Sequence, residues 1–108
     1  MIDWTRVGDL RDEVGAEDFE EVVELFIEEV DEAIERLRAE AYETSLAAEL
    51  HFLKGSAMNL GFSGFADLCS AAEQTAEQGG QVNTAGIVAS YEMARTAFLA
   101  ERAERLAA

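Results

Sequence analysis

Residues 16–39, AEDFEEVVELFIEEVDEAIERLRA, decide the fold. Apolar side chains recur there at spacings of three and four, which is the repeat of one helix face, while Glu and Asp fill the opposite face. Acidic residues gather at the start of the stretch and Arg36 and Arg38 stand at its end, as the helix dipole favours. The pattern predicts one long amphipathic helix, whose apolar stripe consists of Phe19, Val22, Val23, Phe26, Val30, Ala33, Ile34 and Leu37.

Four further helical segments are expected on either side of this one. A short helix covers about Trp4 to Glu13, before Gly15, and a third runs from Thr44 or Ser45 to Leu60. A fourth begins near Ser63, carries Phe65, Leu68, Cys69 and Ala72, and ends at Gly79-Gly80. The last begins at Asn83 or Thr84, with a stripe of Ile87, Val88, Tyr91, Ala94, Phe98 and Leu106. The chain has no proline and shows no alternation typical of a strand.

A chain of 108 residues suits one compact core. We therefore expect residues 1–108 to form a single all-α domain, an antiparallel up-down-up-down four-helix bundle with a short additional N-terminal helix. Two-layer helical arrangements are an alternative, but short connections favour antiparallel neighbours.

The charge balance limits the kinds of partner that the chain can bind. The formal net charge is −15, and residues 1–50 hold 17 acidic and four basic side chains. Such a surface argues against nucleic acid and against anionic membranes, because both attract clustered Lys and Arg. A single cysteine excludes an internal disulfide, and the sequence shows neither a signal peptide nor a span of about 20 apolar residues. We expect a cytoplasmic monomer.

The third predicted helix carries the only histidine, His51. At about 100° per residue, His51 lies roughly 140° around the helix from the apolar stripe and faces outward. Lys54, Gly55 and Met58 share its side, as do Ala47 and Ala48. Gly55 costs roughly 1 kcal/mol relative to alanine inside a helix, which suggests a close approach by another group. The stripe itself consists of Leu46, Leu50, Leu53, Ala57 and Leu60.

A lone histidine can have several roles. The simplest interpretation is that it is an incidental surface residue without a chemical role. A metal site is not expected, because one histidine and one cysteine supply too few ligands. Ser56 and Ser63 lie near His51 in sequence, but no nucleophile-bearing turn of a hydrolase is recognisable. Chemistry at His51 would require the imidazole to be the nucleophile.

The run HFLKGSAMNLGF resembles the segment around the phosphorylated histidine of histidine-containing phosphotransfer (HPt) domains. His51, Lys54, Gly55 and Gly61 match the pattern H-x-x-K-G-x-x-x-x-x-G of that family. The run is similar also to the phosphotransfer domain of chemotaxis histidine kinases. The resemblance implies a four-helix bundle without kinase activity of its own. It also implies that His51 accepts a phosphoryl group from a receiver-domain aspartate and passes it to another receiver.

The resemblance also implies roles for the neighbours of His51. Lys54 would neutralise the phosphoryl oxygens, and Gly55 would give the partner clearance. Glu73, 22 positions after the histidine, occupies the place of a polar residue that can orient the ring. Chemotaxis kinases also carry a glutamate at the place of Glu73, but they have a second histidine where this chain has Ser70.

Partner docking is expected around His51. Lys54 is the only formal charge from residue 50 to residue 66, a nearly neutral window in an acidic chain. The expected contact residues are Ala47, Ala48, Phe52 and Met58. The partners would be response-regulator receiver domains and an upstream hybrid or histidine kinase, with Mg²⁺ bound by the receiver rather than by this chain.

Three functional classes remain open from the sequence. The leading one is a free-standing phosphorelay intermediate, since the chain begins at Met1 without an attached kinase or receiver segment. The second class keeps the fold but has another role: a phosphate sink or regulator of one response regulator, or a substrate of a chemotaxis-type kinase. The third class is a structural adaptor whose histidine is incidental.

Overall fold

The computed structural model describes residues 1–107, which contain five α-helices and no strand. The helices are α1 (Trp4–Val14), α2 (Ala16–Ala39), α3 (Leu46–Leu60), α4 (Ser63–Glu77) and α5 (Thr84–Arg105). The predicted all-α class is confirmed, and each predicted helix is present close to its expected ends.

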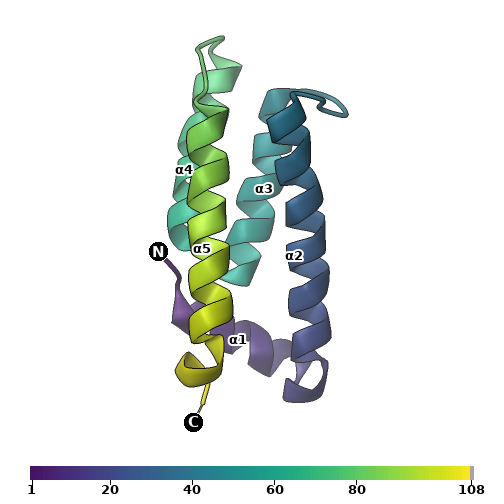
Figure 1. Cartoon of the computed structure of the whole chain (residues 1–108), viewed down its shortest axis with the longest axis vertical. Coiled ribbons are helices and arrows are strands. Elements are labelled where there is room, and N and C mark those ends of the chain that lie inside the picture. Colours follow the sequence, from purple (N-terminus) through teal and green to yellow (C-terminus); the bar gives the residue numbers. More distant parts are fainter. Residues whose placement is uncertain (108) are drawn as a thin grey trace.

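The four longer helices lie side by side along the longest dimension of the molecule, which is 46 Å. In Figure 1, α2 and α5 stand in front and α3 and α4 lie behind them. Each of the four contacts two of the others, in the cyclic order α2, α3, α4, α5. The short α1 crosses their lower end, where it contacts α2 and α3.

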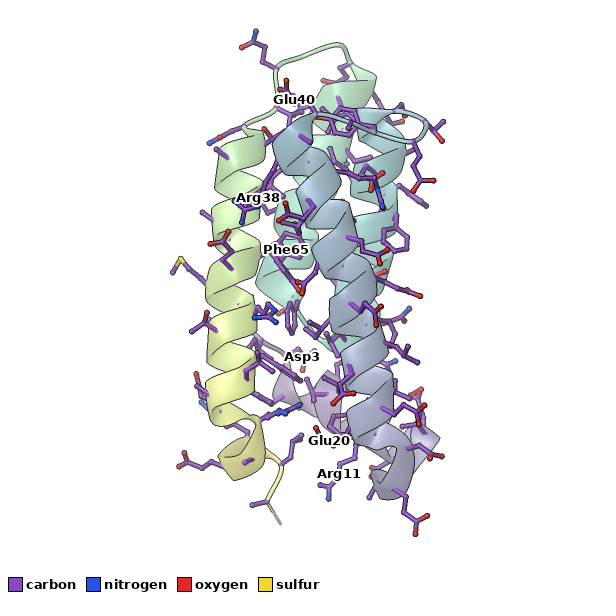
Figure 2. The ribbon with its side chains drawn as sticks, turned by 45° about the vertical axis from the view of Figure 1, so that its right-hand side comes forward. Asp3, Arg11, Glu20, Arg38, Glu40 and Phe65 are labelled. Carbon is purple, nitrogen blue, oxygen red and sulfur yellow. The ribbon has the colours of Figure 1, made fainter. Side chains whose placement is uncertain are left out.

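One continuous apolar core joins all five helices. Its lower part is aromatic: the Trp4 ring of α1 stacks on Phe98 of α5 with centroids 5.6 Å apart, and Phe62 contacts Phe98 and Tyr91. Figure 2 shows Phe65 of α4 between the helices, where its ring lies 5.4 Å from Tyr91. Stacked and tilted aromatic pairs add to the burial of their apolar area. They therefore fix α1 against the end of the other helices.

Three of the helix ends have the capping chemistry that the sequence predicts. The Ser45 hydroxyl accepts a hydrogen bond of 3.1 Å from the Ala48 N–H and begins α3, and Asn83 caps α5 in the same way. Gly61 ends α3 with a φ of 93°, a left-handed conformation that favours glycine. A Cβ at Gly61 would lie 2.8 Å from Val7 Cγ2, so α1 also requires a glycine there.

The buried faces differ from the predicted stripes at several positions. Ile27 of α2 is buried, because α2 packs against three other helices and its apolar face is wider than the stripe. Leu68 of α4 is 39% exposed, since the buried side of that helix is the narrow face of Phe65, Ala66 and Cys69. Phe62 is buried although it lies between helices.

The acidic residues concentrate on the outer surface of α2. Between residues 16 and 35 this helix has ten Asp or Glu side chains and no Lys or Arg.

None of the helices in residues 1–107 is long and apolar enough to cross a membrane.

Candidate functional site

Helix α3 presents the histidine because its opposite face is fixed in the core. Leu50, Leu53 and Leu60 are at most 1% exposed, and this face determines the rotation of the helix. The His51 side chain is 68% exposed, so it projects away from the core, as the leucine spacing predicts. An exposed imidazole on a well-packed helix is accessible without any unfolding of the bundle.

Glu73 of α4 joins the two polar residues of α3. Its Oε2 atom lies 3.0 Å from His51 Nδ1, and its Oε1 atom lies 3.0 Å from Lys54 Nζ. His51 and Lys54 are one helical turn apart, so a single carboxylate on the adjacent helix reaches both. The sequence spacing alone could not establish this contact, because it depends on how α3 and α4 pack.

The electrostatics of the cluster keep this carboxylate ionised. The hydrogen bond from Lys54 has the largest effect and lowers the pKa of Glu73. Desolvation opposes it with the next largest effect, and the bond to His51 lowers the pKa further. An ionised carboxylate can only accept, so His51 Nδ1 must be the donor. The neutral ring therefore has its hydrogen on Nδ1 and its lone pair on Nε2.

The space around the ring is open on the outer side. His51 Nε2 has no hydrogen bond within residues 1–107. A Cβ placed on Gly55 would meet nothing within 4 Å, so no contact within residues 1–107 requires a glycine there. Phe52 is 39% exposed and Met58 is 59% exposed, while Ala48 is exposed and Ala47 is half-buried. Three of the four expected contact residues are thus at the surface.

An ion pair near His51 in which one partner is buried was not predicted. Glu49 of α3 is only 6% exposed, and its Oε1 atom accepts from Arg36 Nε of α2 at 2.5 Å. Arg36 also approaches Glu43 at 3.3 Å. The only sequence signal was a glutamate adjacent to the core position Leu50. The pair fixes the start of α3 to the end of α2, two residues before His51.

Helix α1 also reaches the surroundings of the site, which the sequence did not indicate. A hollow of about 520 Å³ lies between α1, α3 and α4, and Lys54, Met58 and Arg6 line it. The Arg6 Nε atom donates a hydrogen bond to the Asn59 carbonyl of α3 at 3.1 Å. The hollow extends the surface beside Lys54 toward the N-terminal helix.

The other potentially reactive groups do not form a second centre. Within residues 1–107, no three His, Cys, Asp or Glu side chains are grouped so that they could hold a metal ion. Cys69 is fully buried, and burial raises the pKa of its thiol to about 12. A thiol of that pKa is a poor nucleophile at neutral pH.

Comparison with known proteins gives one family. Residues 21–108 match the family model described as Hpt domain. The match covers most of α2 and the helices that follow it, and it leaves α1 outside. No curated protein and no solved structure matches the chain.

Proposed function

Because the chain belongs to the Hpt domain family, a family of phosphorelay modules in two-component signalling, we propose that it carries a phosphoryl group on His51. His51 would accept the group from the aspartyl phosphate of one receiver domain and pass it to the aspartate of another. The observation that carries this assignment is the exposed ring whose Nδ1 is occupied by Glu73, which leaves Nε2 free.

The transfer needs a nucleophilic nitrogen and an in-line approach. The Nε2 lone pair forms the N–P bond while the bond between phosphorus and the receiver's carboxylate oxygen breaks, and the carboxylate leaves with that electron pair. The hydrogen stays on Nδ1, so the ring becomes positively charged. The Glu73 carboxylate, 3.0 Å away, stabilises this charge. Transfer to the second receiver reverses the same steps.

Lys54 is proposed to neutralise the phosphoryl oxygens. In the unphosphorylated protein its ammonium group is bound to Glu73, and the side chain is 28% exposed. A lysine has a flexible stem and three donors, so it can turn toward a new anion one turn along the helix. Lys54 stabilises the phosphorylated form only by the amount by which its contact with the phosphoryl oxygens is stronger than its contact with Glu73.

Gly55 and the exposed apolar residues are proposed to form the docking surface. Gly55 lies in open space, so its missing side chain gives room to a partner. Ala48, Phe52 and Met58 surround His51 at the surface, and Ala47 contributes at the edge. Such a patch, nearly free of charge, suits a transient interface with an apolar centre and a polar rim.

The remaining features follow from the same proposal. The chain would have no kinase activity of its own, and Mg²⁺ would be bound by the acidic pocket of the receiver. We infer a cytoplasmic monomer that binds receiver domains and an upstream hybrid or histidine kinase.

The long helices would form an up-down-up-down bundle. The short connections 40–45, 61–62 and 78–83 support this topology, since each links neighbouring helices.

A chemotaxis-type kinase as the direct phosphoryl donor is a second candidate. The contact between Glu73 and His51 favours it, because those kinases also have a glutamate at the corresponding position. Ser70 disfavours it, because it replaces their second histidine. A phosphate sink for one receiver would use the same residues. It would differ from a relay only in that the phosphoryl group is not passed on to a second receiver.

Incubation with a phosphorylated receiver domain tests the function. The chain should acquire a label that is acid-labile and base-stable, as expected of phosphohistidine. His51→Gln should abolish the label, and the matched surface variant Gln74→Ala should retain it. Label that persists in His51→Gln would contradict the assignment. A second, unlabelled receiver then distinguishes a relay, which loses the label to it, from a sink, which does not.

A further inference from the structure

The seam between α2 and α5 is hollowed along most of its length. Four hollows of about 400 to 520 Å³ follow it from one end of the molecule to the other. The seam lies on the face opposite α3 and α4, which carry His51 and Glu73. Figure 2 shows this face with Glu20 toward one end of the seam and Arg38 toward the other.

Three ion pairs cross the seam and separate the hollows. Arg102 lies 3.0 Å from Glu20, and Arg95 lies 3.5 Å from Asp31. Arg38 is paired with Glu92 nearer the other end. The outer contacts between α2 and α5 are therefore polar, and apolar surface is accessible between them.

The hollow between Arg102 and Arg95 combines an apolar floor with an acidic wall. Val23 and Ile27 of α2 line it, and Leu99 of α5 is 40% exposed at the opposite side. A leucine with that exposure, next to core residues, offers apolar area to another molecule.

The α2 wall of this hollow is formed by Glu24, Glu28 and Glu32. They are spaced by one helical turn, they are exposed, and none has an ion pair within residues 1–107. Like charges one turn apart on a helix destabilise it. The row is therefore electrostatically unfavourable in the isolated chain, and a row of cations along it would remove that repulsion.

We propose that the groove formed by Val23, Ile27, Leu99 and the row of Glu24, Glu28 and Glu32 binds a cationic amphipathic helix of a partner polypeptide. Its Lys or Arg side chains, one turn apart, pair with the glutamate row, and its apolar side chains fill the hollow beside Leu99. Charge complementarity selects this occupant. A second copy of this acidic chain would oppose like charge to like charge, and an anionic lipid surface would be repelled.

The groove and the histidine surface are on opposite faces, so both can be occupied together. A helix bound at the α2–α5 groove would hold the chain near a partner while the His51 face exchanges receivers. This inference does not depend on the phosphorelay assignment, because its test measures binding to unphosphorylated protein.

The test uses the full chain and a fluorescently labelled helical peptide with lysines one turn apart along one face and leucines along the adjoining face. Binding is followed by anisotropy at constant ionic strength. Glu24→Gln/Glu28→Gln should weaken binding on the order of tenfold, as expected for the loss of two ion pairs. The matched control Glu21→Gln/Glu29→Gln removes the same charge from exposed positions of α2 outside the hollows, and it should change binding by less than about twofold. Leu99→Ala should also weaken the complex, after thermal unfolding has verified that the variant is folded.

Backbone amide shifts of isotopically labelled protein locate the peptide independently of any variant. Changes confined to α2 and α5 support the proposal. Equal weakening by the two double variants would mean general attraction to an acidic protein and would overturn it. Changes centred on α3 and α4 would overturn it as well, and so would equal affinity for a scrambled peptide or binding that appears only with self-association of the chain.

Discussion

His51 Nδ1 and Glu73 Oε2 lie 3.0 Å apart although they are 22 residues apart in sequence. The contact joins α3 to α4 at the surface, and Glu73 is at the same time 3.0 Å from Lys54. One half-buried carboxylate thus determines both the hydrogen position on the imidazole and the resting position of the only lysine. Because it makes two contacts, its removal should have two separable effects.

The first prediction concerns the tautomer of the ring. In Glu73→Ala, His51 should lose its preference for hydrogen on Nδ1, and Nε2 should carry hydrogen in part of the molecules. Those molecules lack the lone pair that attacks phosphorus, so phosphotransfer should slow on the order of tenfold. Nitrogen-15 NMR of the imidazole reports the tautomer directly. The neighbouring variant Gln74→Ala should leave spectrum and rate unchanged. An unchanged tautomer in Glu73→Ala would exclude a positioning role.

The second prediction concerns pH. Lys54 is the main cause of the lowered pKa of Glu73, so Lys54→Met should move that pKa upward toward its usual value. A lowered folded-state pKa stabilises the protein above the unfolded-state pKa, and this contribution is lost as pH falls through the folded-state value. In Lys54→Met the folded-state and unfolded-state pKa values of Glu73 approach each other. The variant should therefore be less stable near neutral pH, and the part of the acid-induced loss of stability that comes from Glu73 should shrink.

Carbon-13 NMR of the Glu73 carboxyl gives the titration midpoint, and thermal unfolding between pH 3 and pH 7 gives the stability profile, a range chosen to include the usual Glu pKa of about 4.3. Arg38→Met provides the control, since Arg38 pairs with Glu35 and Glu92 and not with Glu73. A Glu73 midpoint that does not change in Lys54→Met would contradict the electrostatic account.

The helices were predictable because their signals are local. The apolar spacing of residues 16–39, the Ser45 and Asn83 caps and the Gly61 stop each act within a few residues, and α2, α3 and α5 begin and end close to where they indicate. Leu68 was misjudged because periodicity gives the direction of a face and not its width. That width depends on which helices pack against it.

The site was predictable only in part. The outward direction of His51 follows from the leucine stripe on its own helix, so one sequence segment was enough. The contact with Glu73 required a resemblance, and the ion pair of Glu49 with Arg36 had no usable signal. A charged residue beside a core position is normally solvated, and only the packing of α2 on α3 shows that Glu49 is covered.

The third prediction concerns the ion pair between Arg36 and the buried Glu49. Arg36→Met should leave the Glu49 carboxylate buried without its partner, at a cost of about 3 kcal/mol in the free energy of unfolding. Replacing both, as Arg36→Met/Glu49→Met, should recover most of the loss because no unpaired charge remains. Denaturant unfolding measures both values. Arg38→Met, which removes an arginine from exposed pairs of the same helix turn, should cost less than about 1 kcal/mol. Equal losses for Arg36→Met and Arg38→Met would show that burial of Glu49 has no energetic consequence.

The fourth prediction compares two glycines of the same helix segment. Gly61 has a φ of 93° and contacts Val7 and Asp3 of the N-terminal segment, so Gly61→Ala should destabilise the fold by about 2 kcal/mol. Gly55 has neither constraint, so Gly55→Ala should stabilise the helix by about 0.5 to 1 kcal/mol.

Phosphotransfer should show the opposite order for these two variants. Gly55→Ala places a methyl group where the receiver is proposed to approach His51, and a larger side chain in Gly55→Gln should slow transfer further while the fold stays intact. Folded Gly61→Ala should transfer at close to the normal rate, because Gly61 lies at the far end of α3 from the histidine. Thermal unfolding and single-turnover transfer from a phosphorylated receiver measure the two properties on the same samples. A Gly55→Gln variant that transfers at the normal rate would remove the clearance role, since the stability of the isolated chain gives no other reason for a glycine at this position.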